Sequence, residues 1–572
     1  MRMCFKKIMI FFFYILLFTS ILFLHFNANS IRETSIHLKS ENLSTQWKYN
    51  GTVICNITGY QTQYTTLIDS NENIFVSWAD RRQDDGDIYL QKISGNGQML
   101  WEINGISVYN DTNNSKYPRM VLDGEGGVIL SWQDNRTGQN EIYIQRVNSQ
   151  GKLLWTNMGK NITNISSLKE KPDLINTSDG NFVVVWQDNR TGTDDIYTQK
   201  FDINGNLLWG ENGIAICNAT DDQQIFAMGR TLIGTNDGGI VVTWQDARDD
   251  TGDIYVQRLD TNGISQWDLN GTILCNETDF QGMAIINKIN DDNFTITWSD
   301  QRNGGGLLQN DLYIQKVNSS GTPQWSLNGT IISNATGLQE YVNVNTPNES
   351  NIITFWQNEQ GVSGDVIIQN FNSTGHKKWG VNGTIVANKT GEERNPFCTI
   401  SNGAICVAWV DKTKTPYTAL LLQKIDSNGM KIWTVPAIAL NNTHDLSIIN
   451  MISDGDGGII VTWFDQRNDV NGDLYMLRLN SSGGIWVPPP STGGSEPPPD
   501  IRWILILVLA ITLPIAVVGA AVIAVVIIHR RRAVPEMLLK KATTLKKLPE
   551  DHEKLLKTVG VFLAFMVKFK KG

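Results

Sequence analysis

An aspartate, an arginine and a tyrosine recur together along the chain, at a fixed distance after a tryptophan. Each aspartate lies two residues after its tryptophan, each arginine lies four residues after it, and the tyrosine follows in the next apolar run. A carboxylate beside a guanidinium and a phenol could transfer a proton or hold an anion. The six groups of tryptophan, aspartate and arginine are Trp78, Asp80, Arg82; Trp132, Asp134, Arg136; Trp186, Asp188, Arg190; Trp244, Asp246, Arg248; Trp298, Asp300, Arg302; and Trp463, Asp465, Arg467.

The repetition of this group favours structure over catalysis. An active site uses one constellation, whereas this one recurs at six equivalent positions. We therefore predict no catalytic residue in it, and expect the aspartate to pair with the arginine and with backbone amides and so to fix a loop. Two repeats lose the arginine and the tyrosine, in WQNEQ at 356–360 and WVDKT at 409–413. We interpret that loss as relaxed constraint, with a specialised face as the alternative.

Short strands must carry these residues. In the segment 120–155 the apolar runs are brief, β-branched and separated by Gly, Asn and Asp, which predicts four antiparallel strands joined by tight turns. The tryptophans return roughly every 54 to 58 residues, a period typical of propellers. The chain therefore predicts an all-β fold with an eight-bladed β-propeller over residues 43–487. Seven blades remain the alternative if a terminal unit lies outside the ring.

The two ends of the repeat array compete to close the ring. The segment 46–56 (QWKYNGTVICN) resembles an outer strand that precedes its own blade, so it could pair with the last blade and remove an exposed sheet edge. The segment 482–486 (SGGIW) could fill the same place. The sequence leaves both open.

The third-to-fourth-strand element reads FDINGNLLW at 201–209, LDTNGISQW at 259–267 and VNSSGTPQW at 317–325. It resembles the tryptophan-docking motif of quinoprotein-type (PQQ-like) propellers, in which this tryptophan packs between neighbouring blades. The resemblance covers most of the repeat region and implies a fold. Its enzymatic implication would be a quinoprotein dehydrogenase, but those enzymes carry a vicinal cysteine pair and this sequence has none.

The ends of the chain predict a place at the cell surface. Residues 1–30 have a basic start and a long apolar run, as in a signal peptide or an uncleaved signal anchor. Residues 488–500 form a Pro/Gly-rich stalk, and residues 501–528 are apolar and long enough to be a transmembrane helix. Residues 529–572 are basic and partly amphipathic, and we expect them to form a short cytoplasmic tail with helical structure. The predicted location is the plasma membrane, with a single pass and the propeller outside.

Sequons for N-glycosylation are spread over the repeat region and stop before the apolar run at 501–528. This distribution favours a glycosylated exterior. The candidate acceptors are Asn50, Asn56, Asn218, Asn270, Asn276, Asn328, Asn334, Asn382, Asn388, Asn441 and Asn480.

Cysteine usage allows one bridge. Cys55, Cys217 and Cys275 occupy the same place in three repeats and are expected to be small buried side chains. Cys398 and Cys406 flank a short turn, where an oxidising exterior would permit a disulfide. The sequence leaves open whether these two cysteines form a disulfide or remain free thiols.

Metal and nucleic-acid functions find little support. The acidic loops at 84–87 and 249–253 have oxygens suited to calcium, but not the spacing of a calcium loop, so no cofactor is predicted and calcium alone stays open. The net charge of −9 argues against a nucleic-acid partner.

The leading hypothesis is a non-enzymatic surface propeller that binds or adheres to a glycan, a protein or an envelope component through its loops. One alternative is an ectoenzyme, either a quinoprotein-like dehydrogenase or a glycan hydrolase. The other is a passive structural protein of the cell surface.

Overall fold

The structure is a computed structural model that describes residues 47–487, apart from 84–85, 112–113, 228, 250, 304–309, 361–362, 389–391, 415–416, 434–436, 443 and 469. Strands are the regular elements of this part of the chain, and it contains no helix long and apolar enough to cross a membrane. The predicted signal segment 1–30, stalk 488–500, transmembrane helix 501–528 and tail 529–572 lie outside the described residues.

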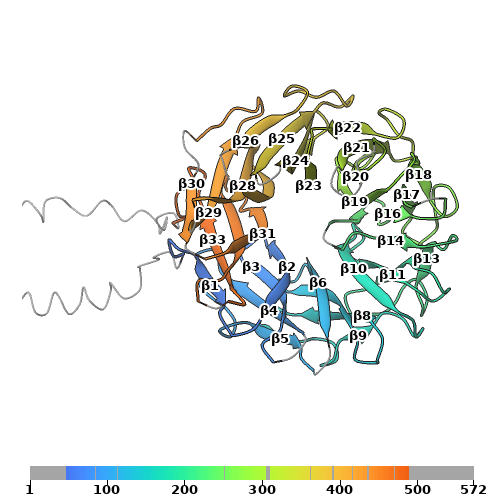
Figure 1. The fold of residues 1–572 in the computed structure, drawn as a ribbon. Coiled ribbons are helices and arrows are strands. Elements are labelled where there is room, and N and C mark those ends of the chain that lie inside the picture. Colours follow the sequence, from blue (N-terminus) through green and yellow to red (C-terminus); the bar gives the residue numbers. More distant parts are fainter. Residues whose placement is uncertain are drawn as a thin grey trace, which may run out of the picture. The chain divides into compact units, whose positions relative to one another are not determined.

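Eight antiparallel sheets follow one another around a ring (Figure 1). Seven of these sheets have four strands each. In the remaining sheet, which is the fourth along the chain, the innermost strand is divided into two pieces. The prediction of an all-β, eight-bladed propeller is thereby confirmed, and the alternative of seven blades is wrong. Blades are numbered here by the order of their inner strands along the chain.

Each blade runs from an innermost strand at the centre of the ring to an outer strand at the rim. The innermost strands are β2 (Gln61–Ile68), β6 (Ser115–Leu122), β10 (Lys169–Asn176), β14 (Gln223–Gln224) with β15 (Leu232–Gly234), β19 (Gln281–Lys288), β23 (Leu338–Asn348), β27 (Glu393–Ser401) and β31 (Leu446–Ser453). The second strands are β3 (Ile74–Asp80), β7 (Val128–Asp134), β11 (Phe182–Asp188), β16 (Ile240–Asp246), β20 (Asn293–Asp300), β24 (Asn351–Gln360), β28 (Ala404–Lys414) and β32 (Ile459–Asp465).

The third strands are β4 (Asp87–Ile93), β8 (Glu141–Val147), β12 (Asp195–Phe201), β17 (Asp253–Leu259), β21 (Asp311–Asn318), β25 (Ser363–Phe371), β29 (Tyr417–Ile425) and β33 (Asp473–Leu479). The outer strands are β5 (Ile106–Tyr109), β9 (Lys160–Asn161), β13 (Ile214–Cys217), β18 (Thr272–Cys275), β22 (Thr330–Ser333), β26 (Thr384–Ala387), β30 (Ala437–Asn442) and β1 (Thr52–Cys55).

The core lies between blades, because both faces of each sheet are covered by neighbours. In blade 3, every residue of β11 and β12 is buried, which explains the run of apolar residues in β11. Trp186 is fully buried, and Gly213 approaches it so closely that a Cβ there would lie 2.8 Å from the indole ring. Gly213 also has a φ of +68°, a conformation that a larger side chain rarely adopts.

The N-terminal strand closes the ring. β1 pairs with β33, so the last blade consists of β31, β32 and β33 from the end of the array and β1 from its beginning. Trp47 is buried, and its indole N–H donates to the carbonyl of Gly95 in blade 1 over 3.0 Å. Of the two segments that competed for this place, the one at 46–56 therefore takes it.

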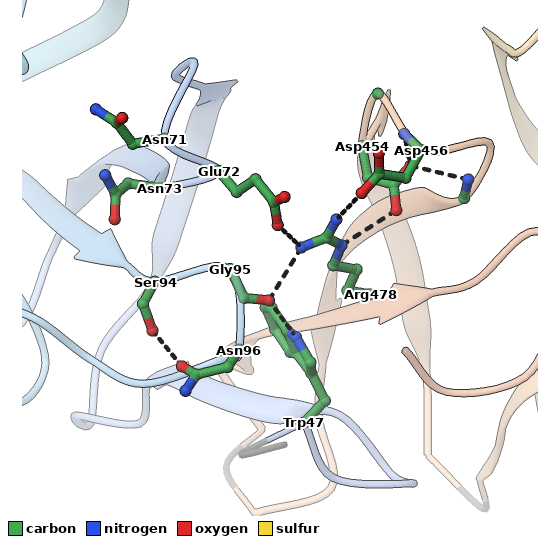
Figure 2. Close-up of polar contacts among 12 residues, drawn as sticks. Trp47, Asn71, Glu72, Asn73, Ser94, Gly95, Asn96, Asp454, Asp456 and Arg478 are labelled. Carbon is green, nitrogen blue, oxygen red and sulfur yellow. Dashed lines mark hydrogen bonds and ion pairs between the residues drawn. The ribbon is translucent and has the colours of Figure 1, made fainter. Parts of the chain in front are cut away.

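A buried arginine fastens the same junction (Figure 2). Arg478 of β33 is fully buried and donates to Asp454 of its own blade over 3.1 Å. It also donates to Glu72 over 2.7 Å and to the Gly95 carbonyl over 3.1 Å, both in blade 1. One cation thus joins the last blade to the first, and its burial is tolerated because carboxylates on both sides compensate the charge.

The equivalent basic residue of other blades makes the same kind of junction. Lys200 is almost fully buried and donates to Asp179 of its own blade over 2.6 Å. It also donates to the carbonyls of Gly238 and Thr261 in the next blade, over 2.9 Å and 3.2 Å. Sequence reasoning missed this set, although a Lys or Arg directly after the Tyr-x-Gln of most repeats was a visible signal. Its other members with contacts to a neighbouring blade are Lys92, Arg258 and Lys424.

Candidate functional site

The repeated aspartate is the centre of a buried hydrogen-bond network. In blade 3, Asp188 accepts the indole N–H of Trp186 over 2.8 Å and the backbone N–H of Arg190 over 3.0 Å. The Arg190 guanidinium donates to it over 2.5 Å, and the hydroxyl of Ser167 donates over 2.7 Å. Burial alone would raise the pKa of Asp188, but these hydrogen bonds outweigh it and hold the pKa below its usual value.

Aromatic stacking completes the group. The Arg190 guanidinium lies 3.8 Å from the centre of the Tyr197 ring, and that ring stacks on Trp186 with centroids 6.3 Å apart. The same contact between aspartate and arginine occurs in all six complete repeats. The aspartate accepts from the tryptophan, the arginine side chain and a backbone amide of its own blade, so this group fixes the loop between the second and third strands.

The structure overturns the disulfide option. The register of β27 and β28 pairs Cys398 with Val407 and Cys406 with Thr399, and both cysteines are free thiols. A shift of one residue places the two side chains on opposite faces of the sheet. Burial raises the pKa of Cys406 to about 11. Of the two arrangements that the sequence left open, the structure has the free thiols.

The cysteines that occupy the same position in three repeats are buried beside the aspartate network; they are Cys55, Cys217 and Cys275. The thiol of Cys217 lies 3.7 Å from Asp246 of the next blade, and Arg248 donates to the sulfur over 3.1 Å. Burial raises the pKa of Cys217 to about 12. These thiols are therefore protonated packing groups at neutral pH.

Most sequon asparagines with described side chains are exposed: Asn50, Asn56, Asn218, Asn276, Asn334, Asn382 and Asn388. Asn270, Asn328 and Asn480 are half-buried. The Asn328 amide donates to Glu277 over 2.6 Å, which occupies the nitrogen that a glycan would need. The side chain of Asn441 lies outside the described residues.

Among the residues that the structure describes, no group of three or more His, Cys, Asp or Glu is arranged to hold a metal ion. Asp84 and Asp85 of the first acidic loop and Asp250 of the second lie outside these residues.

Side chains that differ from blade to blade gather on the innermost strands, close to the face that carries the Asp–Arg loops. Here each of five strands has a bulge with a non-glycine residue at positive φ. Such a conformation is strained and is often kept at functional sites. The five residues are Gln63, Tyr117, Lys171, Met283 and Asn395. The same backbone conformation thus carries an amide, a phenol, an ammonium group and a thioether on different innermost strands.

Blade 4 differs from the others at this level. Four extra residues between Gln223 and Trp244 split its inner strand and form a loop over 225–231. Arg119 of blade 2 donates to the carbonyl of Ala227 in this loop. Asp173 of blade 3 accepts the N–H of Thr231 over 3.0 Å and lies 3.7 Å from Arg119. The loop is therefore held in place by the two preceding blades.

Three carboxylates lie beside Lys171 on the Asp–Arg loop face, and we call them the carboxylate cluster: Glu170, Asp194 and Asp222. The backbone N–H of Asp194 donates to Asp222 over 3.1 Å, and Gln187 donates to the Asp194 carboxylate over 3.1 Å. Burial raises the pKa of Asp194, and the charges of Asp222 and Glu170 raise it further. Sequence reasoning missed this cluster, because its members come from three separate loops and strands.

Comparisons with known proteins place the chain by its fold. No family model matches the sequence, and no curated protein matches it. Among solved structures, it is similar to a polysaccharide lyase described as an ulvan lyase, with 11% identity and a TM-score of 0.45 over 77% of this chain and 96% of the other. It is also similar to the polysaccharide lyase Uly1, with 12% identity and a TM-score of 0.38 over 67% of this chain and 93% of the other. An α-L-arabinanase of Penicillium chrysogenum, in complex with arabinobiose, aligns at 13% identity and a TM-score of 0.32 over 65% and 94%.

The names of these three neighbours, two polysaccharide lyases and an arabinanase, run against the prediction that the protein is not an enzyme. At 11–13% identity the likeness is one of fold, and it assigns no residue of this chain to a reaction.

Proposed function

We propose that this propeller is a glycan-processing enzyme whose reaction takes place at the carboxylate cluster of blades 3 and 4. One observation carries the proposal: Asp194 is half-buried, and burial together with two neighbouring carboxylates raises its pKa. A carboxyl group with a raised pKa holds its proton more readily than a free aspartate and can give it to a leaving oxygen.

The cluster supplies the two roles that glycoside hydrolysis needs. Asp194 donates a proton to the glycosidic oxygen as the C–O bond breaks, and Asp222, which is exposed, acts as the charged partner. Water adds to the sugar carbon and returns a proton to the pair. The two side chains belong to different blades, so the packing of blade 3 against blade 4 sets their separation.

The cations around this site favour an acidic polysaccharide. Lys171 lies next to the cluster, and Arg119 and the exposed Arg230 lie on the neighbouring blades. Cations grouped near a site raise the local concentration of an anionic chain.

A second reaction class is favoured by the residues at positive φ. Tyr117 and Lys171 occupy equivalent positions on adjacent strands, with Arg119 two residues further along the strand of Tyr117. A phenol or amine that removes the proton next to a uronate carboxylate, with a cation neutralising that carboxylate, would perform β-elimination. In that reaction the C–H and glycosidic C–O bonds break and a C=C bond forms.

The test is incubation of the purified protein with polygalacturonate and with a neutral glucan, followed by measurement of reducing ends and of ultraviolet absorbance. Hydrolysis gives reducing ends alone, whereas elimination adds an absorbing double bond. Asp194→Asn is expected to lower hydrolysis by about a hundredfold or more, while Asp260→Asn, in an exposed turn at the rim, leaves it unchanged. If Asp194→Asn retains full activity, the assignment of Asp194 is wrong.

The proposed setting is the outside of a cell. The apolar segment 501–528 and the basic residues after it support a single membrane anchor, and the exposed sequon asparagines support a glycosylated exterior. Protease treatment of intact cells, with an antibody against residues 529–572, tests this orientation: the tail should survive while the propeller is removed.

A further inference from the structure

The tryptophan that precedes each outer strand has a standard position between blades. In five cases its indole N–H donates to a turn carbonyl of the next blade, over 3.0 to 3.3 Å. These residues are Trp47, Trp101, Trp209, Trp267 and Trp325. The ring of Trp325, which belongs to blade 5, also stacks on Phe371 of blade 6 at an interplanar angle of 25°.

Trp155 departs from this arrangement. It meets Phe201, the equivalent of Phe371, edge-on at 82°, and its indole N–H donates to no acceptor in the part of the chain that the structure describes. Lys160 contacts the neighbouring turn instead: its ammonium group donates to the carbonyls of Asn204 and Gly205 over 2.8 Å and 3.3 Å. The register places Thr272, Thr330 and Thr384 at the position of Lys160 in other blades. The different orientation of the Trp155 indole is therefore accompanied by a lysine in place of threonine at position 160.

A pocket of about 460 Å³ opens at this place, between blades 2 and 3. Its lining is Arg146, Leu154, Trp155, Thr156, Lys160, Ile203 and Asn204. Leu154 and the half-buried Trp155 offer an apolar surface, and no carboxylate lines the pocket.

The polar groups of the pocket are mainly donors. Arg146 is balanced by Asp123 and Glu125, whereas Lys160 forms no ion pair with a described residue. The indole N–H of Trp155 adds a donor that has no described acceptor. A ligand that fits must combine a ring with apolar faces and an anionic acceptor.

We propose that this pocket binds an acidic saccharide unit, with the sugar ring against Trp155 and its carboxylate on Lys160. The pocket is formed by the turns and outer strands at the rim, away from the carboxylate cluster. It therefore serves to hold a polysaccharide and takes no part in its cleavage. The inference does not depend on the proposed reaction, because it concerns binding alone.

The experiment is calorimetric titration of the full-length protein with tetragalacturonate, with maltotetraose as the neutral probe and sodium sulfate as the bare anion. Tetragalacturonate should bind, and maltotetraose and sulfate should bind at least about tenfold more weakly. Lys160→Thr, which introduces the residue that blades 4, 5 and 6 have at this position, should raise the Kd for tetragalacturonate at least about tenfold. The control is Lys431→Thr, which removes an exposed lysine of blade 7 and should leave the Kd unchanged.

Equal weakening by both lysine variants would show general attraction of an anionic chain to a basic surface and would overturn the proposal. Equal binding of sulfate would overturn it as well, because the saccharide would then contribute nothing. Asp194→Asn separates this site from the proposed reaction: it should abolish turnover and leave the affinity of the Lys160 site intact.

Discussion

Blade 3 and blade 6 differ in how the hairpin between their second and third strands ends. In blade 3, the pairing of second and third strands ends at Asp188 and Asp195, and the Asp–Arg loop connects them. In blade 6, Asn358 replaces the aspartate and the pairing continues to Gln360 and Ser363. The Asp–Arg pair thus ends the hairpin early and gives the loop a defined shape, whereas without it the strands run on.

The cost of losing the network is visible at the tryptophan. The indole N–H of Trp356 is buried without an acceptor among the described residues, and so is that of Trp409 in blade 7. Trp356 pairs with Ile367 instead of a tyrosine. These two blades keep the packing of the repeat but not its polar contacts, so side-chain packing alone suffices to form a blade.

The largest effect should come from removing the aspartate. Asp188→Ala leaves Arg190 and the Trp186 indole without their acceptor, and we expect the free energy of unfolding to fall by about 3 to 5 kcal/mol. Asn358→Ala in blade 6 should cost about 1 to 2 kcal/mol, since no arginine depends on it. Urea unfolding of both variants measures the difference, and equal losses would contradict the comparison.

Arg190→Lys should have a smaller effect of about 1 to 2 kcal/mol, because lysine keeps the charge but loses the planar stacking on Tyr197. The same urea titration measures it. An unchanged stability would show that the charge alone holds the loop.

The free energy of unfolding should depend on pH through the blades that have the Asp–Arg pair, and this distinguishes them further from blades without it. The folded pKa of Asp188 lies below its unfolded value, so its contribution is present above an unfolded pKa of about 4 and is lost as the pH falls through the folded value. Asp188→Asn removes this group, so the difference in unfolding free energy between wild type and variant should narrow as the pH falls below about 4. A gap independent of pH would argue against a depressed pKa.

The smallest expected effect concerns the two cysteines of the β27–β28 hairpin in blade 7. Because Cys398 and Cys406 are free thiols on opposite faces, a reducing agent should leave the melting temperature unchanged. A fall of several degrees on reduction would show that a covalent bridge does stabilise this hairpin.

The sequence predicted the fold well, because every repeat contains the same alternation of strand and turn. The register of β27 and β28 was harder, since a slip of one residue moves Cys398 to the other face and only packing decides it. The inner-strand loop of blade 4 had a visible signal: Gln223 and Trp244 are 21 residues apart, whereas Lys169 and Trp186 are 17 apart. The carboxylate cluster could not be predicted, because Asp194 and Asp222 meet only when two blades pack together.

The pairing of β1 with β33 has a consequence for biosynthesis. The first strand to leave the ribosome must wait for the last one, so the ring cannot form until nearly all of its repeats have been made. Until then blade 1 lacks its neighbour, and the partly built array has an unpaired edge open to other chains. A truncation that removes residues 47–55 takes away only the outer strand of the last blade, and it should therefore still yield an open, association-prone arc.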